Sequence, residues 1–457
     1  MLLLLGALVT SSLGAPAARR LNLVIITLDT LRADRVSAYG YQRPTTPSLD
    51  QLARQGVLFE RAYTQVPKTL PSHASMFTGR YPASLPCLQN WTPMPESALT
   101  LAEMLRERGY HTAAFVSAAV LVGELNANQG FQLFSDDLSV PLPERALVHL
   151  PYGGPSAVQT AVQWATEVSA ATTVSRALSW LQAKRREPFF LWVHLWSPHG
   201  PYLPPEPYRR KFSTDKQGLL AQLNALYDGE VAYADAELGR LLHALRPLRK
   251  RTLICVLGDH GEGLGHKRYL QHAEFVYEPE LRIPLVMAGP GLPRAKRIPS
   301  LAQTVDLLPT ILDFLQQPLP QGVQGKSLMP VIRGETTRVN DFACGQRGST
   351  AAPLARLWLE GPPLPLAAEQ SFIVVDRAGP NKLILSDGSQ ELFNLKDDPQ
   401  ESRNLASQPE NRALLNELTT QLHQSEREWT EQAAPPEPTK AISPELEQRL
   451  RALGYIR

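Results

Sequence analysis

The chain has 457 residues, of which 43% are hydrophobic and 20% are charged, and its formal net charge is +2. This length allows two or more domains, and the composition is that of an ordinary globular protein. A net charge this small gives no sign of a polyanion-binding surface, so we expect no nucleic-acid partner.

The first 17 residues are expected to be a signal peptide. Residues 2–9 form a short apolar run, and small residues follow as far as Ala17. This order is typical of a secretory signal that is cleaved near Ala15 or Ala17. The run is too short to span a bilayer and no later stretch is as apolar, so we predict no transmembrane helix. We therefore expect a periplasmic or secreted protein.

Short apolar runs alternate with helical patterns over the next 300 residues or so. The nearly continuous apolar run at 21–28 is typical of a strand that is buried on both faces of a parallel sheet. Further strands are predicted at 57–63, 111–116, 188–195, 251–257 and 284–289, and helices at 46–56, 99–108, 176–185, 219–245 and 304–314. This alternation predicts an α/β fold with a doubly wound, mostly parallel sheet.

The pattern changes after residue 333. Short strand candidates separated by turn residues lie at 372–377, 382–386 and 390–394, and helical patterns follow at 411–431 and 444–453. Such strands and turns suit an antiparallel sheet. We therefore divide the chain into a signal peptide (1–17), a catalytic α/β domain (18–335) and a small C-terminal α+β subdomain with terminal helices (336–457).

Acidic and imidazole side chains follow two of the predicted strands. Asp29 comes directly after the first strand, and Asp259 and His260 come after the strand at 251–257. In open α/β sheets, ligands bind beyond the carboxyl ends of the strands. This donor set suits one divalent metal, for which Ca, Mn and Zn are the candidates. The alternatives are a helix cap at Asp29 and a glycine-rich turn with a capping acid at Asp259.

Thr69 stands at a predicted helix start. Pro71 is favoured at the first position of a helix, which would place the Thr69 hydroxyl at the positive end of the helix dipole. Such an end attracts phosphate-like or sulfate-like anions through unpaired amides. A hydroxyl beside an anion is placed for nucleophilic attack on a phosphoryl or sulfuryl centre. The alternative is an ordinary helix start in which Thr69 is a weak cap.

Two histidines belong to the predicted strand at 188–195 and to the loop that follows it. His199 lies between Pro198 and Pro201, which stiffen its loop. His194 falls within the strand at 188–195, and we interpret it as a core histidine.

Five motifs together resemble the sulfatase family of the alkaline phosphatase superfamily. They lie, in the family's order, at 28–34 (LDTLRAD), 69–80 (TLPSHASMFTGR), 197–202 (SPHGPY), 258–262 (GDHGE) and 391–405 (ELFNLKDDPQESRNL). The resemblance covers nearly the whole chain after the signal peptide. It implies an alkaline phosphatase-like α/β domain, a small C-terminal sheet and one divalent metal.

The resemblance also implies roles for individual residues. The metal ligands would be Asp29, Thr69, Asp259 and His260, with Thr69 as the nucleophile. The residues near the ester, as proton donors or contacts to its oxygens, would be His199, His266 and His272. The remaining substrate-binding candidates are Lys68, His73 and Arg32.

The chain departs from the family pattern at three positions. The family has Cys or Ser, converted to formylglycine, where this chain has Thr69; it has Arg at His73 and an acid at Thr30. Threonine cannot become the aldehyde hydrate that expels sulfate by collapsing. A threonine ester needs a second in-line attack by water, and phosphoryl centres accept two such displacements with the help of a metal.

These features predict a metal-dependent hydrolase of a sulfate or phosphate ester, with Thr69 as nucleophile. The ester could be a small molecule, a glycan or a lipid. Two alternatives stay open: a phosphoryl or phosphoethanolamine transferase that acts on an envelope glycan or lipid, and a homologue that binds without turnover. The sequence decides neither the metal nor the oligomeric state.

Overall fold

The structure of the chain is a computed structural model. It describes residues 20–85, 87–138, 168–183, 187–216, 218–348, 369–375, 380–433 and 441–452. The predicted signal peptide (1–17) lies outside these ranges. Within them, no helix combines the length and hydrophobicity that crossing a membrane requires.

Eight strands form the large sheet, in the order β4-β3-β5-β1-β6-β7-β2-β8. Neighbouring strands are parallel except at β7, which runs antiparallel to β6 and β2. The bounds are β1 (Asn22–Leu28), β2 (Val57–Tyr63), β3 (His111–Phe115), β4 (Leu133–Ser135), β5 (Phe189–Leu195), β6 (Thr252–Gly258), β7 (Arg282–Ala288) and β8 (Lys296–Gln303). The sheet confirms the predicted fold. The sequence analysis missed β4, which is very short, and β8, an edge strand that begins with basic residues.

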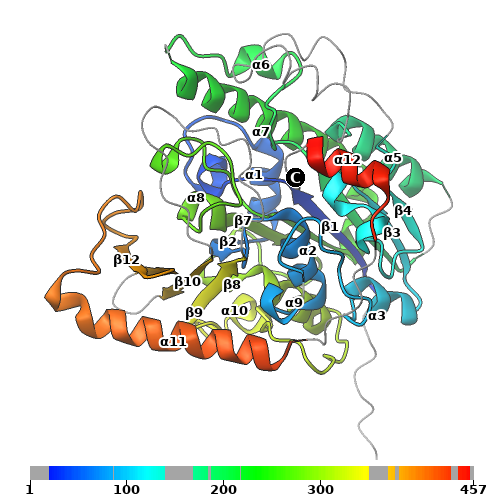
Figure 1. Cartoon of the computed structure of the whole chain (residues 1–457). Coiled ribbons are helices and arrows are strands. Elements are labelled where there is room, and N and C mark those ends of the chain that lie inside the picture. Colours follow the sequence, from blue (N-terminus) through cyan, green and yellow to red (C-terminus); the bar gives the residue numbers. More distant parts are fainter. Residues whose placement is uncertain are drawn as a thin grey trace, which may run out of the picture.

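Helices cover both faces of this sheet (Figure 1). On β1, Leu23 and Ile25 pack with α2, α3, α9, α10 and α12. Val24 and Ile26 alternate with them and pack with α1, α5 and α7. All of β1 is buried, which explains its unbroken apolar sequence. The helices are α1 (Pro47–Gln55), α2 (Thr69–Thr78), α3 (Leu101–Glu107), α5 (Ala170–Gln182), α6 (Tyr208–Lys211), α7 (Leu219–Ala244), α8 (Glu278–Leu281), α9 (Leu307–Phe314), α10 (Met329–Arg333) and α12 (Pro444–Ala452).

A second, antiparallel sheet has the strand order β12-β11-β10-β9. Its strands are β9 (Phe342–Arg347), β10 (Gln370–Val375), β11 (Asn381–Ser386) and β12 (Ser389–Asn394), and α11 (Arg412–Glu431) packs on it. The sequence predicted only the last three strands. In β9, a Cβ on Gly345 would lie 2.1 Å from the carbonyl oxygen of Gln65. This close approach to the large domain requires a glycine, and a glycine weakens the strand signal.

A buried ion-pair group joins the two sheets. Lys382 on β11 is 0% exposed. Its Nζ lies 2.8 Å from Glu401 Oε1 and 3.2 Å from Glu278 Oε1, and Glu278 begins α8 of the large domain. Burial alone would lower the pKa of Lys382, but Glu401 and Glu278 outweigh it and raise that pKa. The chain therefore supplies its own cation to these buried carboxylates.

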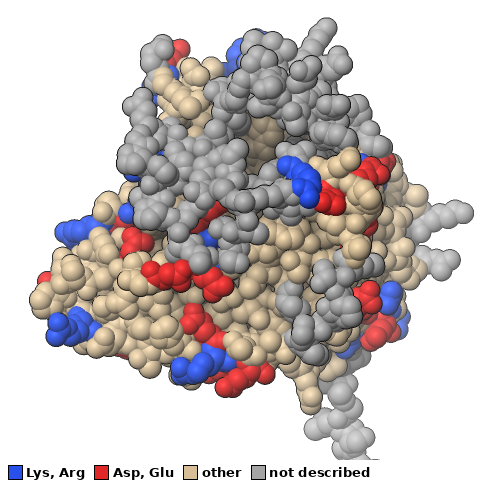
Figure 2. Space-filling model, viewed as in Figure 1, with Lys and Arg blue, Asp and Glu red and all other residues tan. Residues whose placement is uncertain are grey.

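Surface charges are mixed in sign. On the face shown in Figure 2, basic and acidic side chains are interspersed over the described surface. On α12, Arg449 lies 2.7 Å from Glu445 and Arg451 lies 2.6 Å from Glu447. The described part of this face therefore presents no extended surface of one sign.

Candidate active site and metal centre

Asp29 lies directly beyond β1, and Asp259 lies directly beyond β6. Because Leu28 pairs with Gly258 across these parallel strands, the two acids leave the sheet side by side. Thr30 follows with a left-handed φ of 56°, and its amide donates to Asp259 Oδ1 at 3.1 Å. Both carboxylate oxygens of Asp29 are buried and accept no hydrogen bond from the described residues.

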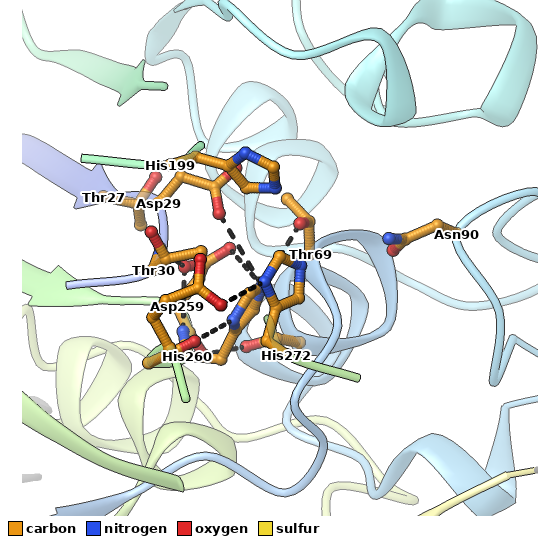
Figure 3. Close-up of polar contacts among 12 residues, drawn as sticks. Thr27, Asp29, Thr30, Thr69, Asn90, His199, Asp259, His260 and His272 are labelled. Carbon is orange, nitrogen blue, oxygen red and sulfur yellow. Dashed lines mark hydrogen bonds and ion pairs between the residues drawn. The ribbon is translucent and has the colours of Figure 1, made fainter. Parts of the chain in front are cut away.

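His260 turns its Nε2 toward the two acids (Figure 3). A Cβ on the next residue, Gly261, would lie 1.9 Å from the carbonyl oxygen of Pro279, so this tight turn requires glycine. His260 Nδ1 donates to the Gly261 carbonyl at 2.9 Å. Its Nε2 lies 3.7 Å from Asp29 Oδ1 and 3.6 Å from Asp259 Oδ2.

Thr69 brings a hydroxyl to the same point. Its Oγ1 lies 3.3 Å from His260 Nε2. Thr69 is the first residue of α2, and extended Lys68 precedes it. The helix therefore begins before Pro71, which corrects the predicted start. Pro71 is tolerated because the amides of a first helical turn have no partner within the helix.

Two amides of the first turn of α2 are already bonded, so they are not open to the anion expected there; the anion site itself stays a prediction. Leu70 N donates to Asn90 Oδ1 at 3.0 Å, and Ser72 N donates to the carbonyl of Lys68 at 3.1 Å. Pro71 has no amide hydrogen. The helix dipole remains, but these positions have no amide hydrogen to offer a ligand. Asn90, which the sequence analysis missed, fixes the start of the helix instead (Figure 3).

His73 links the start of α2 to β1 by two hydrogen bonds. Trp192 Nε1 donates to Thr27 Oγ1 at 3.1 Å. The Thr27 hydroxyl donates to His73 Nε2 at 3.0 Å, and His73 Nδ1 donates to the Thr69 carbonyl at 2.8 Å. Burial lowers the pKa of His73 to about 4, so the ring is neutral. Both ring nitrogens therefore have partners inside the protein, and the substrate-binding role of His73 stays a prediction.

The structure adds His194 to the cluster. This side chain is completely buried, and its Nε2 lies 3.4 Å from Asp29 Oδ2. The sequence analysis placed His194 in the core, because an inward-facing histidine of a buried strand gives no sign of what it reaches. Its position at the end of β5, opposite Thr27 on β1, was the available signal.

Two further imidazoles border the cluster. His199 Nδ1 donates to the carbonyl of Gly200 at 2.6 Å. His272 Nδ1 donates to Glu262 Oε1 at 3.1 Å. The ring centroid of His272 lies 4.6 Å from that of His260 and 4.9 Å from that of His199. The structure thus brings His199 and His272 to the predicted place.

Glu262 is a residue that the sequence analysis left without a role, although it ends the GDHGE motif. The Tyr202 hydroxyl donates to Glu262 Oε2 at 3.0 Å. Burial raises the pKa of Glu262 to about 7. Glu262 therefore fixes the His272 ring, while Tyr202 fixes Glu262.

Arg32 is committed to structural contacts. Its Nε and Nη2 donate to the Asp34 carboxylate at 2.8 and 2.6 Å. Its Nη1 donates to the carbonyls of Glu262 and Gly263, each at 3.0 Å. The guanidinium therefore holds two loops together, and its role in substrate binding stays a prediction.

Lys68 and His266 make their contacts outside the cluster. Lys68 Nζ donates to Gln89 Oε1 at 2.6 Å, and burial lowers its pKa to about 7. His266 Nε2 lies 3.5 Å from Glu401 Oε2, beside the ion-pair group of Lys382. The structure brings neither side chain into contact with Thr69.

The cluster fits a divalent cation. Its three open acceptors, both oxygens of Asp29 and Oδ2 of Asp259, are buried and receive no hydrogen bond from the described residues. Among those residues no lysine or arginine pairs with either acid. Burial, and then Asp259, raise the pKa of Asp29 well above its ordinary value. Ligand atoms of Asp29, Asp259 and His260 lie within 4.8 Å of one another, and such mixed oxygen and nitrogen donors suit a divalent metal.

The fold and this cluster define an α/β protein of the alkaline phosphatase-like class. The sequence profile described as Sulfatase matches residues 21–317. The chain therefore belongs to the sulfatase family, a family of ester hydrolases that generally depend on a divalent metal.

Individual relatives and solved structures are similar to the chain over most of its length. Arylsulfatase K of Rattus norvegicus is 24% identical and aligns with 75% of this chain and 69% of its own. The Delta 4,5-hexuronate-2-O-sulfatase of Bacteroides thetaiotaomicron is 24% identical, over 89% of this chain and 90% of its own. The structure of the phosphonate monoester hydrolase of Agrobacterium radiobacter has a TM-score of 0.70 at 21% identity, covering 90% and 96% of the two chains. This last likeness is one of fold.

Proposed function

We propose that the chain is a metal-dependent hydrolase of a phosphate or sulfate ester in which Thr69 is the nucleophile. One observation carries the proposal: Thr69 Oγ1 lies 3.3 Å from His260 Nε2, and that nitrogen also faces the open carboxylate oxygens of Asp29 and Asp259. A hydroxyl at a buried acidic cluster has the surroundings of an activated nucleophile.

The metal would be held by Asp29, Asp259 and His260, with the Thr69 hydroxyl beside them. Bound there, it would lower the pKa of the hydroxyl and screen the charge of the ester, a contribution of several kcal/mol. The chain itself positions Thr69 through the His73 hydrogen bond to its carbonyl. That position is set before substrate arrives.

The reaction would proceed as two displacements. In the first, the Thr69 hydroxyl gives its proton to a neighbouring imidazole and Oγ1 bonds to phosphorus or sulfur, while the bond to the alcohol oxygen breaks and that oxygen takes a proton. In the second, a water molecule gives a proton to an imidazole and its oxygen bonds to the same centre, while the bond to Oγ1 breaks and Oγ1 takes a proton. His199 and His272 are the residues that would move these protons. Each holds its Nδ1 hydrogen on an acceptor, so each Nε2 carries a lone pair when neutral.

Threonine chemistry favours phosphate over sulfate. A threonine ester has no aldehyde into which it can collapse, so turnover depends on the second in-line attack. Phosphoryl centres accept such attack readily when charge is screened. Relatives with sulfatase names keep a sulfate ester as the second candidate. One of those names specifies a hexuronate, so we propose that the ester belongs to a glycan or a small molecule. We further propose that the protein is periplasmic or secreted.

The test compares Thr69→Ala and Thr69→Ser with wild type on aryl sulfate, phosphate monoester, phosphodiester and phosphonate substrates. We expect Thr69→Ala to lose on the order of 10⁴-fold or more in kcat on the preferred ester, and Thr69→Ser to keep part of it. Thr78→Ala, at the far end of α2, is the matched control and should keep wild-type activity.

Two results would contradict this proposal. Full activity of Thr69→Ala would remove Thr69 as the nucleophile. Transfer of the phosphoryl group to an added alcohol, with no release to water, would make the protein a transferase.

A further inference from the structure

His194 makes contacts that a core histidine does not need. It lies near the end of β5, beside Thr27 of β1, and is 0% exposed. Its Nε2 lies 3.4 Å from Asp29 Oδ2. Neither that nitrogen nor that oxygen takes part in a hydrogen bond with the described residues.

The hydrogen bonds of Ser117 assign the tautomer of His194. The Ser117 hydroxyl donates its single hydrogen to the carbonyl of His194 at 2.6 Å. It accepts the amide hydrogen of Trp196 at 2.8 Å. Ser117 Oγ therefore has only an acceptor site left for His194 Nδ1, which lies 3.3 Å away. The hydrogen of the neutral ring is on Nδ1, and the lone pair of Nε2 points at Asp29.

A lone pair that faces a carboxylate in a buried site is unfavourable unless a positive charge lies between them. A divalent cation bound by both groups would supply that charge. His260 has the same arrangement, because its Nδ1 donates to the Gly261 carbonyl and its Nε2 faces Asp29 Oδ1 at 3.7 Å. Two imidazoles of the same tautomer thus flank one carboxylate.

We propose that His194 is a further ligand of the metal and binds it through Nε2. The site would then have two imidazole nitrogens, from His194 and His260, in addition to Asp29 and Asp259. Imidazole suits zinc and other first-row transition metals, whereas calcium takes oxygen ligands. The inference rests on the proposed metal site and narrows its occupant to a transition metal of the zinc or manganese kind.

X-ray absorption of the full chain loaded with zinc tests this directly, because scattering from the imidazole ring reports how many histidines bind. We expect two imidazoles per zinc in the wild type and one in His194→Gln. The zinc affinity of His194→Gln should fall by at least about 100-fold. A thousandfold excess of calcium should leave zinc in place. His111→Gln, which changes a histidine on β3 of the same sheet, is the matched control and should keep two imidazoles.

The wild-type count decides the question even where His194→Gln fails to fold. A single imidazole in the wild type, or displacement of zinc by an equal concentration of calcium, would overturn this inference and leave the proposed hydrolase intact. A wild-type protein that binds no divalent cation would overturn both.

Discussion

Two groups of buried charges in this chain are built in opposite ways. Around Lys382, the chain supplies its own cation, 2.8 Å from Glu401 and 3.2 Å from Glu278. Around Asp29 and Asp259, the described neighbours are imidazoles, hydroxyls and amides, and several acceptors stay open. Burying an unpaired ion costs several kcal/mol. The first group is therefore complete, while the second needs a cation from outside.

This difference separates a structural group from a functional one. The Lys382 group joins β11 of the small sheet to α8 of the large domain, and nothing in it requires a ligand. The Asp29 group lies at the carboxyl ends of parallel strands, where α/β proteins bind their ligands. Buried acids that a protein does not balance itself are candidates for function.

Of the changes that distinguish the two groups, metal removal should give the largest effect. Treatment with a strong chelator should lower ester hydrolysis by at least about 10³-fold, because charge screening contributes several kcal/mol. Zinc or manganese should restore activity, and metal analysis before and after treatment checks the loading. Full activity in protein shown to be free of metal would break the comparison, since the Asp29 group would then function without a cation.

Replacing the internal cation should cost stability. Lys382→Met should lower the free energy of unfolding by about 3–5 kcal/mol, because it removes the buried cation that pairs with Glu401 and Glu278. Urea unfolding measures this change, and the metal content of the folded variant should equal that of the wild type. Lys396→Met, at an exposed turn after β12, is the control. A loss no larger than in that control would show that the group is not a balanced unit.

The glutamate behind His272 should affect turnover more than structure. Glu262→Gln should lower kcat by about 10²-fold, because the amide still accepts from His272 Nδ1 but no longer stabilises a protonated ring. Since the two residues act as a unit, adding His272→Gln should lower kcat little further. Steady-state kinetics of the single and double variants test this. Fully additive losses would contradict the coupling.

The smallest expected effect is on the free energy of unfolding when one acid in each group is made neutral, and its sign should differ between the two groups. In metal-free protein, Asp29→Asn should raise the free energy of unfolding by about 1 kcal/mol, because it removes an unbalanced buried charge. Glu401→Gln should lower the same quantity, because it breaks an ion pair. Urea unfolding in the presence of chelator gives both numbers. Two changes of the same sign would refute the contrast between the groups.

Much of the fold can be read from the sequence, because strands buried on both faces are apolar throughout, as β1 is. The sequence pattern fails to predict a strand whose residues are fixed by contacts with a neighbouring part of the fold. β9 contains Gly345, which the large domain requires, and its sequence alone does not indicate a strand.

The site divides in the same way. Asp29, Asp259, His260 and Thr69 stand at element ends, where position along the chain already indicates proximity. The side chains of His194 and Asn90 contact residues that are distant in the sequence, and no local sequence pattern predicts such contacts. The contact of Arg32 with Asp34, two residues away, likewise has no local pattern that predicts it.

The hydrogen-bond chain from Trp192 through Thr27 and His73 to Thr69 has a fixed polarity. The indole at one end only donates, and the carbonyl at the other end only accepts, so no link can reverse. The backbone of Thr69 is thereby tied to β5 and β1, two neighbouring strands of the large sheet. If Thr69 acts as proposed above, the frame that holds its backbone comes from the sheet and does not depend on which ester is bound.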